Sequence, residues 1–313
     1  METGEFERWI VEEIRGFVRE DPGNRLERLD GSPIFQEPLV GFVSGEDPIF
    51  DRLKQIIGEF HMTPAEVMGA VAQQRGLSVP AAAEVGVISF VLPISSETRQ
   101  ENRQMKDRPS ERWAHTRLFG EEFNRKVQAH LVSVLELKGH FAVAPEMEES
   151  LFRMLLDEKV GLASTWSQRH VAFCAGLGTF GLSDGLITAA GKGHRVGSVV
   201  VDHALDSPEA RTEDPYRDCL SHQELGCRNC IKRCPVDAIS EDGHDKRKCM
   251  EFVMKQIPLV KEEYGMARLS NFIPKVAEES SKDIANAIVD DVVSFMGDAE
   301  QFDDMTLMIM KLK

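Results

Sequence analysis

The stretch Val85-Gly-Val-Ile-Ser-Phe-Val-Leu-Pro93 sets the fold class of this 313-residue chain. It is a short run of β-branched and apolar residues closed by a proline, which is typical of a strand buried inside a sheet. Segments 140–144 and 197–202 also have strand character, whereas a polar segment between 95 and 112 is expected to contain a loop. Apolar residues at helical spacing predict helices over 6–18, 49–60 and 110–138. Helices and short strands therefore alternate through about residue 205, which predicts a mixed α/β (α+β) domain.

The composition restricts the class of protein. Apolar residues make up 42% and charged residues 28% of the chain, which allows a sizeable core and excludes a disordered or fibrous chain. No apolar run reaches the roughly 18 residues that a membrane span needs, and the N-terminus lacks the features of a secretory signal. A cytoplasmic protein without a membrane partner is therefore expected. The net charge of −15 argues against broad nucleic-acid binding, because a polyanion is repelled.

Five of the six cysteines lie between residues 219 and 249. In a reducing compartment such a group is expected to bind metal rather than to form disulfides. Its centre, Cys227-Arg-Asn-Cys230-Ile-Lys-Arg-Cys234-Pro235, reads C-x2-C-x3-C-P, the latter part of a ferredoxin cluster motif. A structural zinc site is the alternative, since paired cysteines suit zinc as well. The spacing before the proline favours an iron–sulfur cluster, with the candidate ligands Cys219, Cys227, Cys230, Cys234 and Cys249.

A second segment, Ala175-Gly-Leu-Gly-Thr-Phe-Gly181, contains the G-x-G-x-x-G pattern of dinucleotide-binding proteins. That pattern requires a strand before it, whereas residues 166–174 are typical of a helix, so a Rossmann site is not expected. Dense glycines still imply close approach of the backbone to a cofactor or to a packed neighbouring element. Cys174 beside them is expected to be a small core residue. The candidate cofactor-binding residues are Gly176, Gly178, Gly181 and Gly185.

Together these segments resemble the epoxyqueuosine reductase-like iron–sulfur proteins, relatives of the reductive dehalogenases. The likeness extends over roughly residues 30–265 and is carried by the glycine segment, by Gly185-Leu-Ile-Thr188, by Gly197-Ser-Val-Val-Val-Asp202 and by the cysteine motif with Cys249. It implies a nitroreductase-like domain over residues 1–205 and a ferredoxin-like [4Fe-4S] module over residues 206–264. It also implies an oxidoreductase that takes electrons from a donor such as a ferredoxin or flavodoxin and passes them to cobalamin, with a small-molecule or RNA-base substrate.

The chain departs from that family at three places. Residues 161–168 contain no carboxylate where the family has its proton-donating aspartate, and Gly181-Leu-Ser-Asp184 replaces Gly-Lys-Asn. No cysteine follows Cys249. Two clusters need about eight thiolates, so the five candidates predict a single [4Fe-4S] cluster. A non-catalytic electron-transfer or redox-sensing protein is the alternative function.

From about Gly265 the chain instead resembles the C-terminal end of bacterial sporulation-type, metal-dependent serine phosphatases. The resemblance is carried by Ile284, Ile288, Val292 and Phe295 at helical spacing and by Gln301-Phe-Asp-Asp-Met-Thr-Leu307. It implies that Asp303 helps to hold a divalent metal. The other metal-binding aspartates of that family are not found upstream. An α-β tail over residues 265–313 is therefore expected, and a metal-dependent serine phosphatase fragment is the third hypothesis for function.

Overall fold

In the computed structural model, β2 (Gly86–Pro93) is the strand that residues 85–93 predict, and all eight of its residues are buried. It pairs antiparallel with β1 (Leu39–Ser44) and with β8 (His194–Val201). β8 also pairs antiparallel with the short β3 (Ala142–Val143). The order in this four-stranded sheet is β1-β2-β8-β3, so the buried strand is an interior one.

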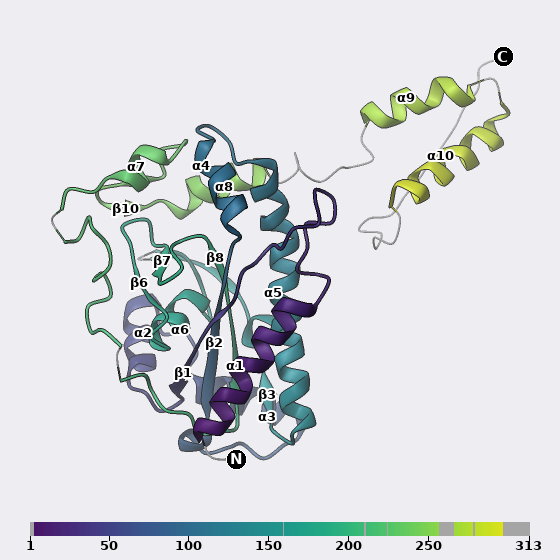
Figure 1. Ribbon diagram of the computed structural model, residues 1–313. Coiled ribbons are helices and arrows are strands. Elements are labelled where there is room, and N and C mark those ends of the chain that lie inside the picture. The colour runs from purple at the N-terminus through teal and green to yellow at the C-terminus, as the bar shows by residue number, and fades with distance from the viewer. Residues whose placement is uncertain are drawn as a thin grey trace. The chain divides into compact units, whose positions relative to one another are not determined.

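Different helices cover the two faces of this sheet (Figure 1). Val87 and Val91 pack with α2, α3 and α6, whereas Ile88 and Phe90 point to the opposite face and pack with α1 and α5. These helices are α1 (Thr3–Glu20), α2 (Ile49–Ile57), α3 (Pro64–Arg75), α5 (Glu111–Leu137) and α6 (Gln168–Cys174). The mixed α/β class predicted from the sequence is therefore confirmed.

Side-chain caps fix where several helices begin. Thr63 and Glu66 form a capping box at α3, in which each side chain accepts a hydrogen bond from the backbone N–H of the other residue. Ser110 caps α5 by accepting from the N–H of Trp113 at 3.1 Å. Ser95 caps a further helix, α4 (Ser96–Gln104), inside the polar segment where a loop was expected. The loop begins only after this helix.

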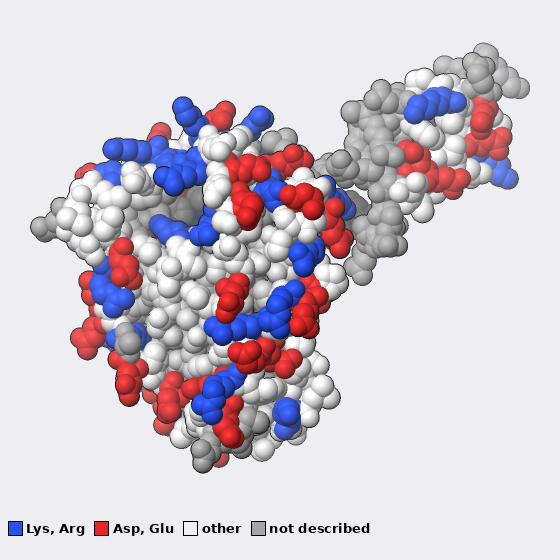
Figure 2. All heavy atoms as spheres, viewed as in Figure 1, with Lys and Arg blue, Asp and Glu red and all other residues white. Residues whose placement is uncertain are grey.

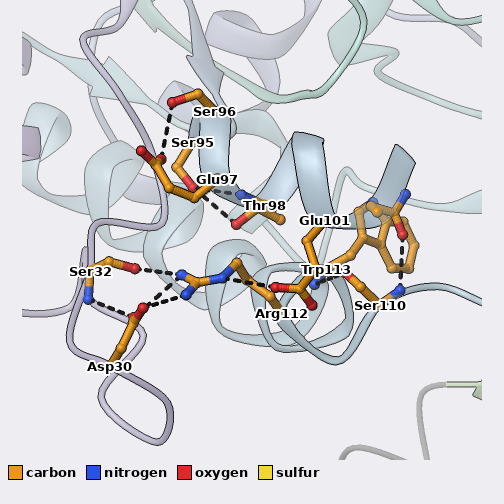
Figure 3. A network of polar contacts seen from close by, with 11 residues as sticks. Asp30, Ser32, Ser95, Ser96, Glu97, Thr98, Glu101, Ser110, Arg112 and Trp113 are labelled. Atoms are coloured by element: carbon orange, nitrogen blue, oxygen red, sulfur yellow. Dashed lines mark hydrogen bonds and ion pairs between the residues drawn. The ribbon is translucent and has the colours of Figure 1, made fainter. Parts of the chain in front are cut away.

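Arg112, in the first turn of α5, forms hydrogen bonds with the loop after α1 and with α4 (Figure 3). Its guanidinium donates to both carboxylate oxygens of Asp30 and to the hydroxyl of Ser32 at 2.6 Å, both in the loop after α1. It also donates to the carboxylate of Glu101 on α4 at 3.3 Å. These hydrogen bonds hold the pKa of Asp30 well below its usual value. α4 is thereby anchored to α5 and to the loop after α1.

The remaining strands of the described residues form three small antiparallel hairpins. They are β4 (Met154–Asp157) with β5 (Gly161–Ser164), β6 (Gly178–Phe180) with β7 (Leu186–Thr188), and β9 (Ile239–Ser240) with β10 (Gly243–His244). The cysteine segment adds two helices, α7 (Asn229–Arg233) and α8 (Lys246–Gln256). Two single turns of 3-10 helix span Ala82–Glu84 and Pro145–Met147.

The chain divides into two compact units, Met1–Gln256 and Ile257–Lys313. The second contains α9 (Met266–Val276) and α10 (Ser281–Met296), and α10 includes the predicted helix positions Ile284 and Ile288, both buried. The further domain boundaries near residues 205 and 265 stay predictions.

The structure describes residues 3–158, 160–209, 211–223, 225–256, 266–277 and 279–296. Asp303, the metal ligand expected in the tail, lies outside these ranges. Within them, no helix combines the length and the apolar character needed to cross a bilayer.

Candidate functional site

The glycine-rich segment forms a turn and a hairpin. α6 ends at Cys174, and Gly176 takes a left-handed φ of 73°, which lets the N–H of Leu177 bond back to the carbonyl of Ala172 at 2.9 Å. A Cβ atom at Gly176 would lie 3.2 Å from Pro208. β6 and β7 follow as an antiparallel pair. A helix thus precedes the glycines and a hairpin follows them, which is not the strand–loop–helix of a dinucleotide site.

The other candidate glycines lie against atoms of the chain itself. A Cβ atom at Gly178 would lie 2.3 Å from the carbonyl oxygen of Ile187 on the paired strand. A Cβ atom at Gly181 would lie 3.1 Å from Nζ of Lys192, and one at Gly185 would lie 3.1 Å from Cε of the same lysine. Packing against the backbone of Ile187 therefore excludes a side chain at Gly178, whereas at Gly181 and Gly185 the nearest atoms belong to the flexible Lys192 side chain. A role of the glycines in cofactor binding stays a prediction.

Three cysteines of the C-x2-C-x3-C-P motif lie on or beside α7. Cys227 precedes the helix, Cys230 lies within it and Cys234 follows its last residue. All three are free thiols and partly exposed. The backbone N–H of Ala238 donates a hydrogen bond to Sγ of Cys234 at 3.1 Å. Hydrogen bonds from backbone N–H groups to cysteine sulfurs are a common feature of iron–sulfur sites.

Cys219, the candidate ligand before the motif, lies in a turn beside the β6–β7 hairpin and is 8% exposed. Burial raises the pKa of its thiol, but the N–H groups of Leu182, His222 and Ser221 bond to the sulfur and bring the pKa below its ordinary value. Leu182 belongs to the turn between β6 and β7. Cys219 therefore contacts the hairpin directly.

Cys249 on α8 reaches the same hairpin through a second contact. It touches His244 of β10, and Nδ1 of His244 lies 3.8 Å from Oδ2 of Asp184 in the hairpin turn. Asp184 and Cys249 raise the pKa of His244 to about 9, and contact with His244 lowers the pKa of Cys249. Asp184 adopts a left-handed φ of 54°, and its carbonyl accepts a hydrogen bond from the guanidinium of Arg169.

Lys246 fixes the start of α8 near the same place. Its Nζ atom donates to the carbonyls of Val160 and Leu162, each at 3.2 Å, and lies 4.0 Å from Asp184. Asp184 and His244 could not be identified as site residues from the sequence, because no motif spacing joins a hairpin turn to a residue sixty positions later. The sequence signal that pointed to this region was the basic run Lys246-Arg-Lys248, which lies beside a cysteine in an acidic chain.

A series of buried hydrogen bonds holds segment 161–168, which contains no carboxylate of its own. The indole N–H of Trp166 donates to Ser198 at 2.9 Å, and the Ser198 hydroxyl donates to Gln168 at 2.7 Å. The Gln168 amide donates in turn to the carboxylate of Glu146 at 2.9 Å. Burial raises the pKa of Glu146. Segment 161–168 therefore has a carboxyl group beside it, contributed by a residue that the sequence analysis did not single out.

The cysteines and the groups around them have the chemistry that an iron–sulfur cluster needs. Five free thiols, a backbone N–H directed at one sulfur and a guanidinium beside two others are features that such clusters use. The guanidinium is that of Arg228, whose pKa is raised first by Glu241 and then by Cys227 and Cys230. In the described part of the chain, no three His, Cys, Asp or Glu side chains converge closely enough to hold a metal ion.

A groove of about 470 Å³ lies on other elements, α1 and α5. It is lined by Glu12, Glu13, Gly16, Phe17, Glu20, Asp21 and His130. None of the cysteines or candidate glycines belongs to this lining, so the groove is separate from the candidate site.

No protein-family profile and no curated protein sequence matches this chain. Among solved structures, it is similar to epoxyqueuosine reductase from Bacillus subtilis, with 14% identity and a TM-score of 0.42 over 80% of this chain. It is also similar to an epoxyqueuosine reductase holding an epoxyqueuosine-modified tRNA-Tyr stem loop (14% identity, TM-score 0.40, 78% of this chain and 57% of that one). The enzyme from Streptococcus thermophilus is similar too (14% identity, TM-score 0.39, 77% of this chain and 56% of that one). The chain spans 57% of the length of the Bacillus subtilis structure.

Proposed function

We propose that this chain is an iron–sulfur oxidoreductase-like protein that carries one [4Fe-4S] cluster and delivers single electrons to a cofactor or substrate beside the β6–β7 hairpin. Cys227, Cys230 and Cys234 would hold the cluster, together with Cys219 or Cys249. The observation that carries the proposal is the hydrogen bond from the Ala238 N–H to the Cys234 sulfur, at the end of a C-x2-C-x3-C-P motif.

Binding of the cluster is expected to draw the sulfur atoms together. Metal sites are rarely preformed before the metal binds, so part of the binding free energy orders the ligand loops. The three motif cysteines lie on one short segment, and all are at least partly exposed. We therefore expect incorporation of iron and sulfide to rigidify residues 219–249.

The residues around the cysteines have definable roles in this proposal. When bound, the cluster supplies one-electron transfer chemistry. Arg228 offsets negative charge at Cys227 and Cys230, and the Ala238 N–H does so at Cys234. Cys219 contacts the turn of the β6–β7 hairpin directly, and Cys249 reaches that turn through His244, so a route from the cysteines to the α/β core begins there.

Anaerobic reconstitution with iron and sulfide tests this proposal. We expect a broad visible absorption band that bleaches on reduction with dithionite. The Cys227→Ser/Cys230→Ser variant should lack this band, whereas Cys174→Ala should retain it, because Cys174 is buried in the core away from the motif. Zinc bound in place of iron, with no acid-labile sulfide, would show a structural zinc site instead.

A non-catalytic electron-transfer or redox-sensing protein is the second candidate. It is favoured by the absence of a carboxylate within residues 161–168. Cobalamin titration of the reconstituted protein separates the two functions, since binding supports the enzyme. If the protein is an enzyme, both a small molecule and an RNA base are substrates to be tested. The net charge of −15 argues against nucleic-acid binding, but Lys and Arg side chains gather locally on the surface (Figure 2).

A further inference from the structure

Cationic side chains from two distant parts of the sequence gather where α4 meets α7. Arg103 and Lys106 lie at the end of α4 and just after it, and Lys232 and Arg233 lie on α7; all four are exposed. We call these four residues the basic face. Figure 2 shows Lys and Arg side chains concentrated over the region where Figure 1 places these two helices. The face stands out because the chain carries a net charge of −15.

Arg233 holds the two halves of the basic face together. Its guanidinium donates to the carbonyls of Arg103 at 3.0 Å, Asn102 at 3.4 Å and Met105 at 3.5 Å. These carbonyls close the C-terminal end of α4, where a cation is favoured by the helix dipole. α7 is thereby fixed against α4. Among the described residues, the side chains of Arg103, Lys106 and Lys232 donate no such hydrogen bond to a backbone carbonyl.

The acidic residues of α4 do not neutralise the basic face. Glu101 is engaged by Arg112, and Glu97 lies in the first turn of α4, at the other end of the helix from Arg103. Figure 3 shows that both carboxylates point to partners on α4 and α5. Residues 102–108 hold three cations, Arg103, Lys106 and Arg108, and one carboxylate, Asp107, so positive charge exceeds negative charge at the end of α4.

The basic face adjoins the cysteines at the helix that carries them. Lys232 and Arg233 lie between Cys230 and Cys234 in the sequence, on α7 or at its end. Leu225, two residues before Cys227, exposes 68% of its surface. Exposed apolar and cationic side chains both suit a small transient protein interface, in which charge steers the encounter. α4 and α7 contain no aromatic residue on which an RNA base could stack.

We propose that the basic face is the docking surface for an acidic one-electron carrier protein, which delivers electrons to the cysteine site. This inference rests on the proposed iron–sulfur function. In each transfer the reduced carrier loses one electron and the oxidised site gains one, and no bond is made or broken. Negative charge on the carrier would be attracted to α7, which brings its redox group close to Cys230 and Cys234.

The test uses flavodoxin, an acidic one-electron carrier, as the probe. Its affinity for the whole protein is measured by fluorescence anisotropy at low and high salt, and its rate of electron transfer to the reconstituted protein is measured by stopped flow. The test variant is Arg103→Glu/Lys106→Glu/Lys232→Glu, which spares the bracing Arg233. The control is Arg8→Glu/Arg25→Glu/Arg52→Glu, which makes the same change of net charge at exposed residues elsewhere.

We expect flavodoxin binding and electron transfer to weaken with salt in the unaltered protein, and both to fall at least about 10-fold in the test variant. The control should stay within about 2-fold, and reduction by dithionite should be the same in all three proteins. Unchanged binding in the test variant would overturn the inference. So would an RNA stem loop that binds through the basic face while flavodoxin does not. A protein that binds flavodoxin but never incorporates iron and sulfide would instead refute the proposed function.

Discussion

The backbone N–H of Ala238 lies 3.1 Å from Sγ of Cys234 and donates a hydrogen bond to it. If this thiolate is a cluster ligand, Cys234→Ser should lower the iron and acid-labile sulfide bound after reconstitution to less than about half, because a hydroxyl is a poor ligand for iron–sulfur clusters. Cys174→Ala is the matched control and should bind as much as the unaltered protein. Equal loss in both variants would indicate that misfolding, rather than ligand removal, is the cause.

Asp47 and Arg211 join the loop before α2 to the segment after β8. Nη1 and Nη2 of Arg211 donate to the Asp47 carboxylate at 2.8 Å and 3.1 Å, and the Asp47 side chain is 4% exposed. Asp47→Ala leaves Arg211 without its carboxylate partner and should lower the free energy of unfolding by about 3 kcal/mol. Urea denaturation followed by circular dichroism measures this. Arg19→Ala, which breaks only an exposed pair with Glu20, should change it by less than about 0.5 kcal/mol.

Acid should destabilise the fold through two histidines, His61, which is buried, and His170, which is partly buried. Nε2 of His61 accepts a hydrogen bond from the Ser167 N–H at 3.1 Å, so this nitrogen is unprotonated. Burial lowers the pKa from 6.5 to about 4 in His61 and to about 3 in His170. Below pH 6.5 the unfolded chain binds protons that the folded chain does not. Stability should therefore fall by about 1.4 kcal/mol per pH unit for each histidine as the pH drops toward 4.

Urea denaturation of histidine variants at a series of pH values checks whether these histidines cause the loss of stability in acid. His61→Gln can still accept from the Ser167 N–H and should reduce the slope of stability against pH by about half. His222→Gln changes an exposed histidine and should leave the slope unaltered. A slope that is the same in all three proteins would assign the acid sensitivity to other groups.

The hairpin glycines should differ in their tolerance of a methyl group. At Gly178 the added Cβ meets the backbone carbonyl of Ile187 at 2.3 Å, and this atom cannot move without disturbing the β6–β7 pairing. At Gly181 the nearest atom is the end of the flexible Lys192 side chain, at 3.1 Å. Gly178→Ala should therefore cost about 2 kcal/mol of stability, and Gly181→Ala less than about 1 kcal/mol. Equal costs in thermal or urea unfolding would contradict this packing.

The elements with a strong apolar pattern could be predicted from the sequence. β2 and β8 are β-branched runs buried in an interior position, and α5 carries an apolar stripe that ends at Gly139 with a left-handed φ of 87°. α4 could not be predicted in this way, because most of its residues are polar and exposed. What holds it is Ser95 at its start and the contacts of Arg112 and Arg233, which come from other segments.

From the sequence, only the site residues that share one short motif could be predicted. The motif at residues 227–235 gave three candidate ligands on one short segment, which the structure places around α7. His244 contacts Cys249 and lies 3.8 Å from Asp184, so it links a helix to a hairpin turn far away in the sequence, and only the tertiary fold brings these residues together. The hydrogen bond between Gln168 and Glu146 could not be predicted either, because the two residues lie on different elements.

A count of metal and acid-labile sulfide in anaerobically purified protein shows whether the cysteine segment binds an iron–sulfur cluster. A single [4Fe-4S] cluster predicts about four iron and about four sulfide per chain. About one zinc per chain without sulfide, or thiols free of any metal, would contradict the account.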